Sequence, residues 1–278
     1  MKEKIEMGGI TLIHVNQYVQ SDFWEPLQHA HDHAEIFLNV LGQMEIFVED
    51  VVYHHNDGEI RIYAPMELHC GRCDRYQHME WYQISLSSRF LQKNPALCAM
   101  FFNREKGKGN VFISQKYSEL IELVTEILEK KRRENPLFEH YFLGNITRVL
   151  CLLNESENNS PVETGKNKVL QEIIKTINEN YSNLKTLEDL CDLVHFSPSY
   201  IYRLFKKHLN TTPHHYISVK KLLKAKELLS SDKEIVEVCY ESGFSDCEYF
   251  ITVFKKAFGV TPYRYKKSEL KKLEKENK

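Results

Sequence analysis

Residues 187–213 read LEDLCDLVHFSPSYIYRLFKKHLNTTP, and residues 235–262 repeat the pattern as IVEVCYESGFSDCEYFITVFKKAFGVTP. Cys191 and Cys239 are equivalent and stand 48 positions apart (239 − 191), whereas the final prolines stand 49 apart (262 − 213). The second copy has therefore gained one residue after its serine. A repeat of this kind indicates two copies of one supersecondary unit.

Each copy is expected to form two short helices joined by a tight turn. Apolar residues in the first segment recur every three or four positions, so they share one helical face. Ser197 can accept the free backbone amides of the second helix as its N-cap, and Pro198 suits the first helical position. In the other copy Gly243 supplies the turn, and Ser245 or Asp246 supplies the cap.

The second helix of each copy is expected to turn a polar face outward. In the first copy the outward residues are Ser199, Tyr202, Arg203, Lys206 and Lys207. In the second copy they are Glu248, Ile251, Thr252, Lys255 and Lys256. Two helices around a tight turn can place the second helix in the major groove of DNA, where we expect these residues to contact bases or phosphates. A helical hairpin that only packs is the alternative for a single copy.

The segment between the copies, HHYISVKKLLKAKELLSSDK at 214–233, has apolar residues at helical spacing and no internal helix breaker. It predicts one connecting helix. A helix of about 16 residues is roughly 24 Å long at 1.5 Å per residue. Such a rod can hold two units on successive turns of a groove, roughly 34 Å apart.

Together these segments resemble the DNA-binding domain of AraC/XylS-type bacterial transcription regulators. The resemblance runs from about Lys166 to Lys267 and includes the order of the units, the connecting helix and the terminal GVTPYRY. It implies a transcription regulator, expected to be an activator, that binds double-stranded promoter DNA, contacts RNA polymerase and forms a homodimer. Lys221 in the connecting helix and Thr252 in the second copy stand where the family usually has arginine. Thr252 argues against a strong guanine contact from the second unit.

The charge distribution agrees with a DNA-binding half. Residues 1–165 carry 16 Lys+Arg and 24 Asp+Glu, a net charge of −8 (16 − 24), whereas residues 166–278 carry 21 and 15, a net charge of +6 (21 − 15). A basic domain gains affinity for DNA by releasing counterions from phosphates. The lysine-rich C-terminal end contributes part of this excess as a solvated tail.

The N-terminal half shows a strand pattern instead. Short apolar runs occupy 10–15, 36–41, 44–48, 60–63 and 81–86, with turn signals between them. They predict an antiparallel β-barrel of the cupin or jelly-roll type. The whole chain is therefore expected to be a multidomain α+β protein, in which this barrel with two helices precedes an all-α tandem helix-turn-helix domain.

Two spacings resemble the motifs of a cupin barrel: His29 and His31 followed by Glu35, and later His69. Phe23 departs from the pattern, because a glycine usually opens the first motif. In metal-binding cupins the four matching residues are ligands, with two imidazoles at i and i+2 of one strand, and such a set suits Zn, Fe, Mn or Ni. AraC-type sensors, as the resemblance implies, often keep these histidines without metal to line a ligand pocket.

We therefore expect no cofactor and no enzyme activity, but a small-molecule effector in the barrel. The candidate effector-binding residues are Trp24, His29, His31, Glu35, His69 and Trp81. Aromatic rings stack on sugar faces and histidines bind hydroxyls, so a sugar is the favoured effector, and core packing is the alternative for each residue. A metal-dependent cupin enzyme, or a metal or redox sensor fused to a DNA-binding domain, is the alternative function.

Cysteine usage and the N-terminus favour a cytoplasmic protein that contacts no membrane. No stretch approaches the roughly 18 apolar residues that a membrane span needs, and residues 1–15 lack the apolar core and cleavage site of a signal peptide. Seven cysteines, an odd number, are expected to be reduced thiols. Cys70 and Cys73 are expected as half-exposed turn residues, with half a zinc site or a redox pair as alternatives.

Two amphipathic segments, 117–133 and 137–153, predict an antiparallel helix pair that packs on the barrel or on a second subunit. The polar stretch NESENNSPVETG follows and predicts an interdomain linker. The expected organisation is an effector-binding domain at 1–105, a helical dimerisation region at 106–153, a linker at 154–165, a DNA-binding domain at 166–268 and a basic tail at 269–278.

Overall fold

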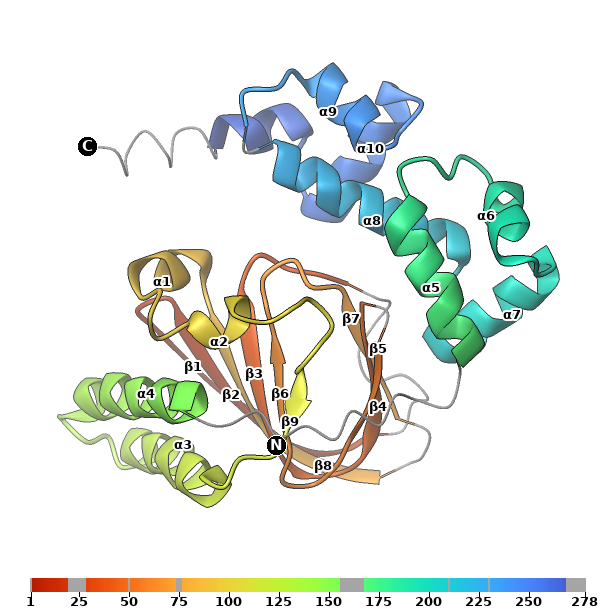
Figure 1. Cartoon of the computed structure of the whole chain (residues 1–278). Coiled ribbons are helices and arrows are strands. Elements are labelled where there is room, and N and C mark those ends of the chain that lie inside the picture. The colour runs from red at the N-terminus through yellow and green to blue at the C-terminus, as the bar shows by residue number, and fades with distance from the viewer. Residues whose placement is uncertain are drawn as a thin grey trace. The chain divides into compact units, whose positions relative to one another are not determined.

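The computed structural model describes residues 2–19, 29–49, 51–73, 77–155, 168–209, 211–229 and 231–268. Trp24, residues 156–165 of the expected linker and the tail at 269–278 lie outside this part of the chain. Contacts divide the chain into two units, Met1–Lys166 and Asn167–Lys278, and Figure 1 labels their elements. No helix among the described residues is long and apolar enough to cross a membrane.

Unit 1 is built mainly of antiparallel strands. They are β1 (Lys2–Met7), β2 (Ile10–Val19), β3 (Ala34–Leu41), β4 (Met44–Val48), β5 (Val51–His55), β6 (Ile60–Tyr63), β7 (His69–Arg72), β8 (Gln77–Leu86) and β9 (Val111–Phe112). The five apolar runs predict β2, β3, β4, β6 and β8, whereas β1, β5, β7 and β9 were not expected. β1 escapes such a prediction because it is mostly charged and buries only Ile5.

The strands form two sheets and not the closed barrel that the sequence predicts. Hydrogen bonds among the described residues link a six-stranded sheet in the order β1-β2-β8-β3-β6-β9 and a three-stranded sheet in the order β5-β4-β7. Each sheet therefore has two edges, as in a two-sheet jelly roll. Apolar runs predict that strands exist but not which edges pair, so this distinction was beyond the sequence pattern.

The large sheet has one apolar face. Its register places Ile36 opposite both Ile62 and Ile84, and all three are fully buried. The helices α3 (Tyr117–Arg132) and α4 (Phe138–Glu155) pack in the same core as this face, and Figure 1 shows them lying side by side. The predicted helix pair is therefore packed within the chain. The shorter helices α1 (Ser88–Lys93) and α2 (Ala99–Phe102) precede them.

The opposite face of the large sheet is polar and aromatic. The register places Glu35 opposite Tyr63 and Ser85. Two residues further along β3, Phe37 lies opposite Arg61 and Gln83. Because residues directly opposite in an antiparallel pair point to the same side, this face gathers charged, amide and aromatic side chains inside the unit. Of the cupin-like motif residues, Glu35 lies on this face, whereas His69 lies on β7 of the three-stranded sheet.

Unit 2 is helical and contains the expected repeat. Its helices are α5 (Lys168–Asn180), α6 (Leu187–Val194), α7 (Pro198–Leu209), α8 (Pro213–Leu228), α9 (Ile235–Glu241) and α10 (Cys247–Phe258), and residues 262–268 are also helical. His195 adopts the left-handed conformation after α6, and the hydroxyl of Ser197 accepts from the Tyr200 amide at 3.4 Å. The Asp246 side chain caps α10. The predicted turns and caps of both copies are confirmed.

The connecting helix α8 is buried at both ends. Near its start the ring of Tyr216 meets Phe205 of the first copy edge-on, with ring centroids 5.7 Å apart. Near its end Leu222 and Ala225 join the core of the second copy, which contains Phe254. The predicted single connecting helix is therefore correct, and its two ends belong to different cores.

The turn of the second copy lies tightly against the segment that follows α5. Gly243 has φ +94°, and a Cβ atom placed on it would lie 2.6 Å from the Cα atom of Ser182. Gly259 also has a positive φ, of +75°, but a Cβ atom there would meet nothing within 4 Å. Gly259→Ala therefore introduces backbone strain alone, whereas Gly243→Ala introduces the same strain and a steric clash.

We expect Gly259→Ala to lower the free energy of unfolding of unit 2 by about 1 kcal/mol, the usual cost of a left-handed alanine. Gly243→Ala should cost about 3 kcal/mol or more, because overpacking against a backbone atom adds to the same strain. Urea unfolding followed by circular dichroism measures both. Equal losses in the two variants would show that the Ser182 contact places no constraint on the turn.

Candidate functional site

The first candidate surface consists of the outward faces of α7 and α10. On α7 the five predicted residues, Ser199, Tyr202, Arg203, Lys206 and Lys207, are all exposed. On α10 the five predicted residues, Glu248, Ile251, Thr252, Lys255 and Lys256, are exposed as well. The opposite faces bury apolar side chains, among them Phe205 and Phe254. Tyr249, which its spacing places with the inward residues, is instead 45% exposed.

Local contacts differ between the two outward faces. The guanidinium of Arg203 lies 5.3 Å from the ring centroid of Tyr200, a cation–π contact that holds it along α7. On α10, by contrast, the Thr252 hydroxyl donates to the carbonyl of Glu248 at 2.9 Å. The Thr252 hydroxyl therefore donates its proton within its own helix and not to an outside acceptor. α7 therefore presents the stronger candidate for contact with a base.

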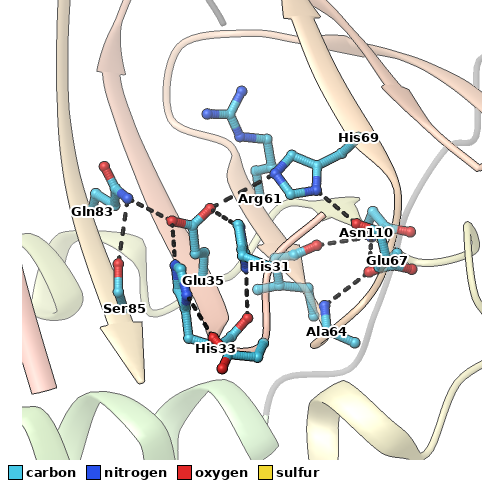
Figure 2. A network of polar contacts seen from close by, with 12 residues as sticks. His31, His33, Glu35, Arg61, Ala64, Glu67, His69, Gln83, Ser85 and Asn110 are labelled. Carbon is cyan, nitrogen blue, oxygen red and sulfur yellow. Dashed lines mark hydrogen bonds and ion pairs between the residues drawn. The ribbon is translucent and has the colours of Figure 1, made fainter. Parts of the chain in front are cut away.

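The second candidate site centres on Glu35, a buried carboxylate at the start of β3 (Figure 2). Its Oε2 atom lies 3.0 Å from Nε2 of His31 and 3.8 Å from Nε2 of His69. Its Oε1 atom lies 3.2 Å from Nε2 of His33 and accepts from Nε2 of Gln83 at 2.7 Å. One carboxylate thus contacts two histidines and an amide, and a third histidine lies close to it.

His69 is oriented by a separate buried network. Its Nδ1 atom donates to the carbonyl of Glu67 at 2.8 Å, which leaves Nε2 as the acceptor of the neutral ring. The Glu67 carboxylate accepts from both terminal nitrogens of Arg104, at 2.9 Å and 2.5 Å. It also accepts from Nδ2 of Asn110 at 2.9 Å (Figure 2). These contacts fix the loop before β7, so the His69 ring is held in place.

The charge states of the cluster follow from burial and from neighbouring charges. Burial opposes ionisation of Glu35, but hydrogen bonds from His31 and His33 outweigh it and hold the pKa of Glu35 well below its usual range. Burial also opposes protonation of His33, but contacts with Asp32 and Glu35 raise the pKa of His33 to about 9. Burial and the neighbouring histidines keep the pKa of His69 well below 6.5. At neutral pH, Glu35 and His33 are therefore charged and His69 is neutral.

The donor set also fits a divalent metal ion. One ligand atom each from His29, His31 and His69 lies within 4.8 Å of the others, and the same holds for His31, His33 and Glu35. A carbonyl that fixes the tautomer of His69 is the usual outer partner of a metal-binding imidazole. The residues present therefore suit a borderline metal such as Zn or Ni.

Two details of the cluster differ from the sequence prediction. His29 and His31 do not share a strand: His29 forms an isolated bridge with His69, and His31 lies in the irregular segment before β3. His33 was not among the predicted residues, although the alternation His31, His33, Glu35 in the sequence is a signal that could have found it. The i, i+2 spacing of His29 and His31 places both rings on one face only in an extended strand. The chain is irregular at His31, so this condition is not met.

The remaining candidates have different surroundings. Trp81 is 5% exposed and belongs to the apolar core between the sheets, together with Phe37. Trp24 lies outside the described residues. Sequence reasoning missed Arg61, which is 2% exposed, lies 3.9 Å above the ring of Phe37 and donates to the Met44 sulfur at 2.8 Å. A strand pattern gives no reason to expect a buried arginine, because arginine side chains are far more often exposed than buried.

The expected surroundings of Cys70 and Cys73 are also corrected. Both are buried, with exposures of 1% and 0%, and are not half-exposed turn residues. Cys70 lies on β7 opposite Phe47. β7 was not predicted, because its four residues HCGR hold little apolar surface.

Comparison with known proteins gives matches to regulators. A family described as "Helix-turn-helix domain" matches residues 190–268. The chain is 24% identical to the HTH-type transcriptional activator RhaR of Mannheimia succiniciproducens over 88% of both chains. It is 30% identical to the XylDLEGF operon transcriptional activator 2 of Pseudomonas putida, over 45% of this chain and 81% of that one.

A third relative is matched over a shorter part of its length. The chain is 27% identical to the uncharacterized HTH-type transcriptional regulator YisR of Bacillus subtilis, over 60% of this chain. The matched region spans 56% of YisR, so the chain covers about half of that protein.

The raised pKa of His33 gives a pH prediction. A group whose pKa rises on folding contributes stability that is complete below its unfolded value, near 6.5, and is lost as the pH rises through about 9. Glu35→Gln should bring the titration midpoint of His33 down by about one unit or more, since it removes a charged partner. Histidine NMR titration measures this midpoint.

Glu80→Gln is the matched control, because Glu80 pairs with His14 at 2.8 Å instead. It should leave the His33 midpoint unchanged. A wild-type midpoint near 6.5, or the same midpoint with and without the Glu35 carboxylate, would contradict the assigned charge states.

Proposed function

Because the chain belongs to the AraC/XylS family of transcription regulators, we propose that it is a sequence-specific DNA-binding activator controlled by a small-molecule effector. The observation that carries this proposal is the pair of exposed faces on α7 and α10, joined through one helix that is buried at both ends. We call α7 and α10 the recognition helices. They enter successive major-groove segments on one side of the DNA.

The two recognition helices contribute unequally. Arg203 on α7 reads a base, since its planar guanidinium can donate two hydrogen bonds to guanine. Lys206 and Lys207 in the last turn of α7 bind phosphates, and so do Lys255 and Lys256 on α10. Thr252 contributes little to base recognition, because its hydroxyl proton is donated to Glu248. The first unit therefore carries most of the specificity.

The effector binds on the polar face of the large sheet in unit 1. Glu35, His31 and Gln83 offer acceptors and donors close together, as a polyhydroxylated ligand needs. The rings of His69 and Tyr63 stack beside this cluster at 3.7 Å, and aromatic rings are the usual partners of the apolar face of a sugar. A sugar is therefore the proposed effector class.

A divalent metal ion is the second candidate ligand for the same residues. The convergence of His29, His31 and His69 within 4.8 Å favours it, and Glu35 would complete the donor set. A metal bound there would act as the regulatory ligand, supplying positive charge beside the Glu35 carboxylate. The chain would then be a metal-responsive regulator of the same family.

Control of transcription requires that the effector bind one arrangement of the protein more tightly than another. As part of the proposal, the regulator forms a homodimer and contacts RNA polymerase at the promoter. Leu137 and Leu143, which are 55% and 45% exposed at and near the start of α4, are apolar residues available to a second copy.

The DNA-binding proposal predicts different effects for two substitutions. Arg203→Ala should relax base preference at one position of the selected site, with a loss of about 1–3 kcal/mol of discrimination. Lys255→Ala should weaken binding to all sequences alike and reduce the slope of log K against log salt by about one. Selection from a random duplex library, followed by binding titrations at several salt concentrations, measures both effects.

The matched control is Lys175→Ala, which removes an exposed lysine from α5, outside both recognition helices. It should change neither base preference nor salt dependence. An unchanged sequence preference in Arg203→Ala would remove α7 as the principal recognition helix.

The effector proposal predicts thermal stabilisation by a sugar. A ligand present at 100 times its Kd adds about 2.7 kcal/mol to the folded state. Thermal unfolding against a panel of sugars should therefore show a clear rise in Tm for at least one, and Glu35→Gln should abolish it. Zinc, nickel and manganese salts tested alongside, with metal content by mass spectrometry, decide the second candidate. No shift with any sugar would refute the sugar proposal.

A further inference from the structure

The outward face of α10 contains an exposed isoleucine. Ile251 is 39% exposed, and its equivalent in the first copy, 49 residues earlier, is Tyr202 (251 − 49). A single exposed apolar residue is common on a protein surface and by itself indicates nothing. Ile251, however, lies one helical turn after Glu248 and one turn before Lys255, in the middle of the surface proposed to enter the major groove. Its place on the recognition helix makes it a candidate for contact with DNA.

The middle of α10 offers fewer hydrogen-bond donors than the middle of α7. On α7 the two central outward residues are Tyr202 and Arg203, which carry a hydroxyl and a guanidinium. The equivalent residues of α10 are Ile251, whose side chain has no polar atom, and Thr252. The Thr252 hydroxyl donates to the carbonyl of Glu248 at 2.9 Å within the helix. Where α7 presents donors, α10 therefore presents hydrocarbon surface.

Packing within unit 2 does not account for an apolar residue at this position. Phe250 and Phe254 of α10 are fully buried in the core of the second copy, and Val253 and Phe258 pack against that core. These side chains hold the inner side of α10 in place. Ile251 lies on the exposed side of the helix, so a polar residue there would leave those contacts intact.

We propose that Ile251 packs against the 5-methyl group of a thymine, so that the second unit selects thymine through an apolar contact. The inference rests on the proposed function, because it requires α10 to lie in the major groove. It adds the base that the second unit recognises to the guanine contact proposed for Arg203. Thymine is the base with a methyl group on its major-groove edge, and apolar side chains are the usual partners of that group.

The contact favours thymine and also disfavours the other bases. The Ile251 side chain has neither a donor nor an acceptor for the polar edges of guanine, adenine or cytosine. Placed against it, the amino, carbonyl and ring-nitrogen groups of those bases would lose water without gaining a hydrogen bond from the protein, which costs free energy. Burial of the thymine methyl group is favourable instead, because apolar surface of both partners is removed from water.

The charges before and after Ile251 favour its position over the bases. Lys255 and Lys256, in the last turn of α10, attract phosphates. At the other end of the helix the exposed Glu248 carboxylate is repelled by phosphates, so it keeps the start of α10 away from the DNA backbone. The last turn therefore lies at the backbone, and the middle of the helix lies over the base edges that carry the methyl group.

The test uses the full chain and a duplex that it selects from a random library. Each thymine of that duplex is replaced by uracil in turn, which removes one methyl group and leaves the hydrogen-bonding edge unchanged. At one position or more, uracil should lower the affinity about fourfold, the contribution of one buried methyl group. Ile251→Ala should bind the thymine duplex about fourfold more weakly and should no longer distinguish uracil at that position. Its Tm should not fall, because alanine favours an exposed helical position.

Val236→Ala is the matched control, because Val236 is an exposed apolar residue of α9, outside both recognition helices. It should keep the full discrimination against uracil. Equal affinity for every uracil duplex, or the same losses in Ile251→Ala as in the wild type, would overturn the inference and leave the DNA-binding function standing. If the full chain selects no duplex, the proposed function itself fails, and the inference fails with it.

Discussion

One uninterrupted helix, α8, fixes the separation of the two helix-turn-helix copies in unit 2, because its two ends are buried in different cores. Tyr216 at one end packs on Phe205, and Leu222 and Ala225 near the other end lie in the core that contains Phe254. Between them, the Lys221 ammonium donates to the carbonyl of Leu184 at 2.7 Å, so its charge is satisfied although the residue is only 8% exposed. The 16 residues of α8 therefore act as a rod of fixed length between two similar units.

In unit 1 the constraint is that the large sheet has two different faces, one apolar and one polar. The face with Ile36 is committed to packing against α3 and α4, so it is unavailable to a ligand. The face with Glu35 gathers buried polar groups, which are costly to desolvate unless they bind one another or a ligand. Retaining three histidines around one carboxylate is difficult to explain by stability alone. This cost supports the proposal that the cluster binds a ligand.

The sequence predicts unit 2 better than unit 1 for a physical reason. Helix caps, the Gly243 turn and the periodicity of α7 and α10 are local, so short stretches of sequence specify them. The outward faces were predicted residue by residue, and only Tyr249 departs from its expected burial. The contact of Gly243 with Ser182 was beyond local reasoning, because it joins residues far apart in the chain.

In unit 1 the decisive features are pairings between distant segments. Motif spacing predicted His29, His31, Glu35 and His69 as neighbours, and the structure brings them together. It could not predict His33, whose role depends on the irregular path before β3, nor the two-sheet pairing.

The central claim, that a rigid rod holds two recognition helices on one side of DNA, is tested most directly by a hydroxyl-radical footprint. The account predicts two protected windows on the selected duplex, about 10 to 10.5 base pairs apart and on the same face of the helix. A single window, or two windows on opposite faces, would contradict it.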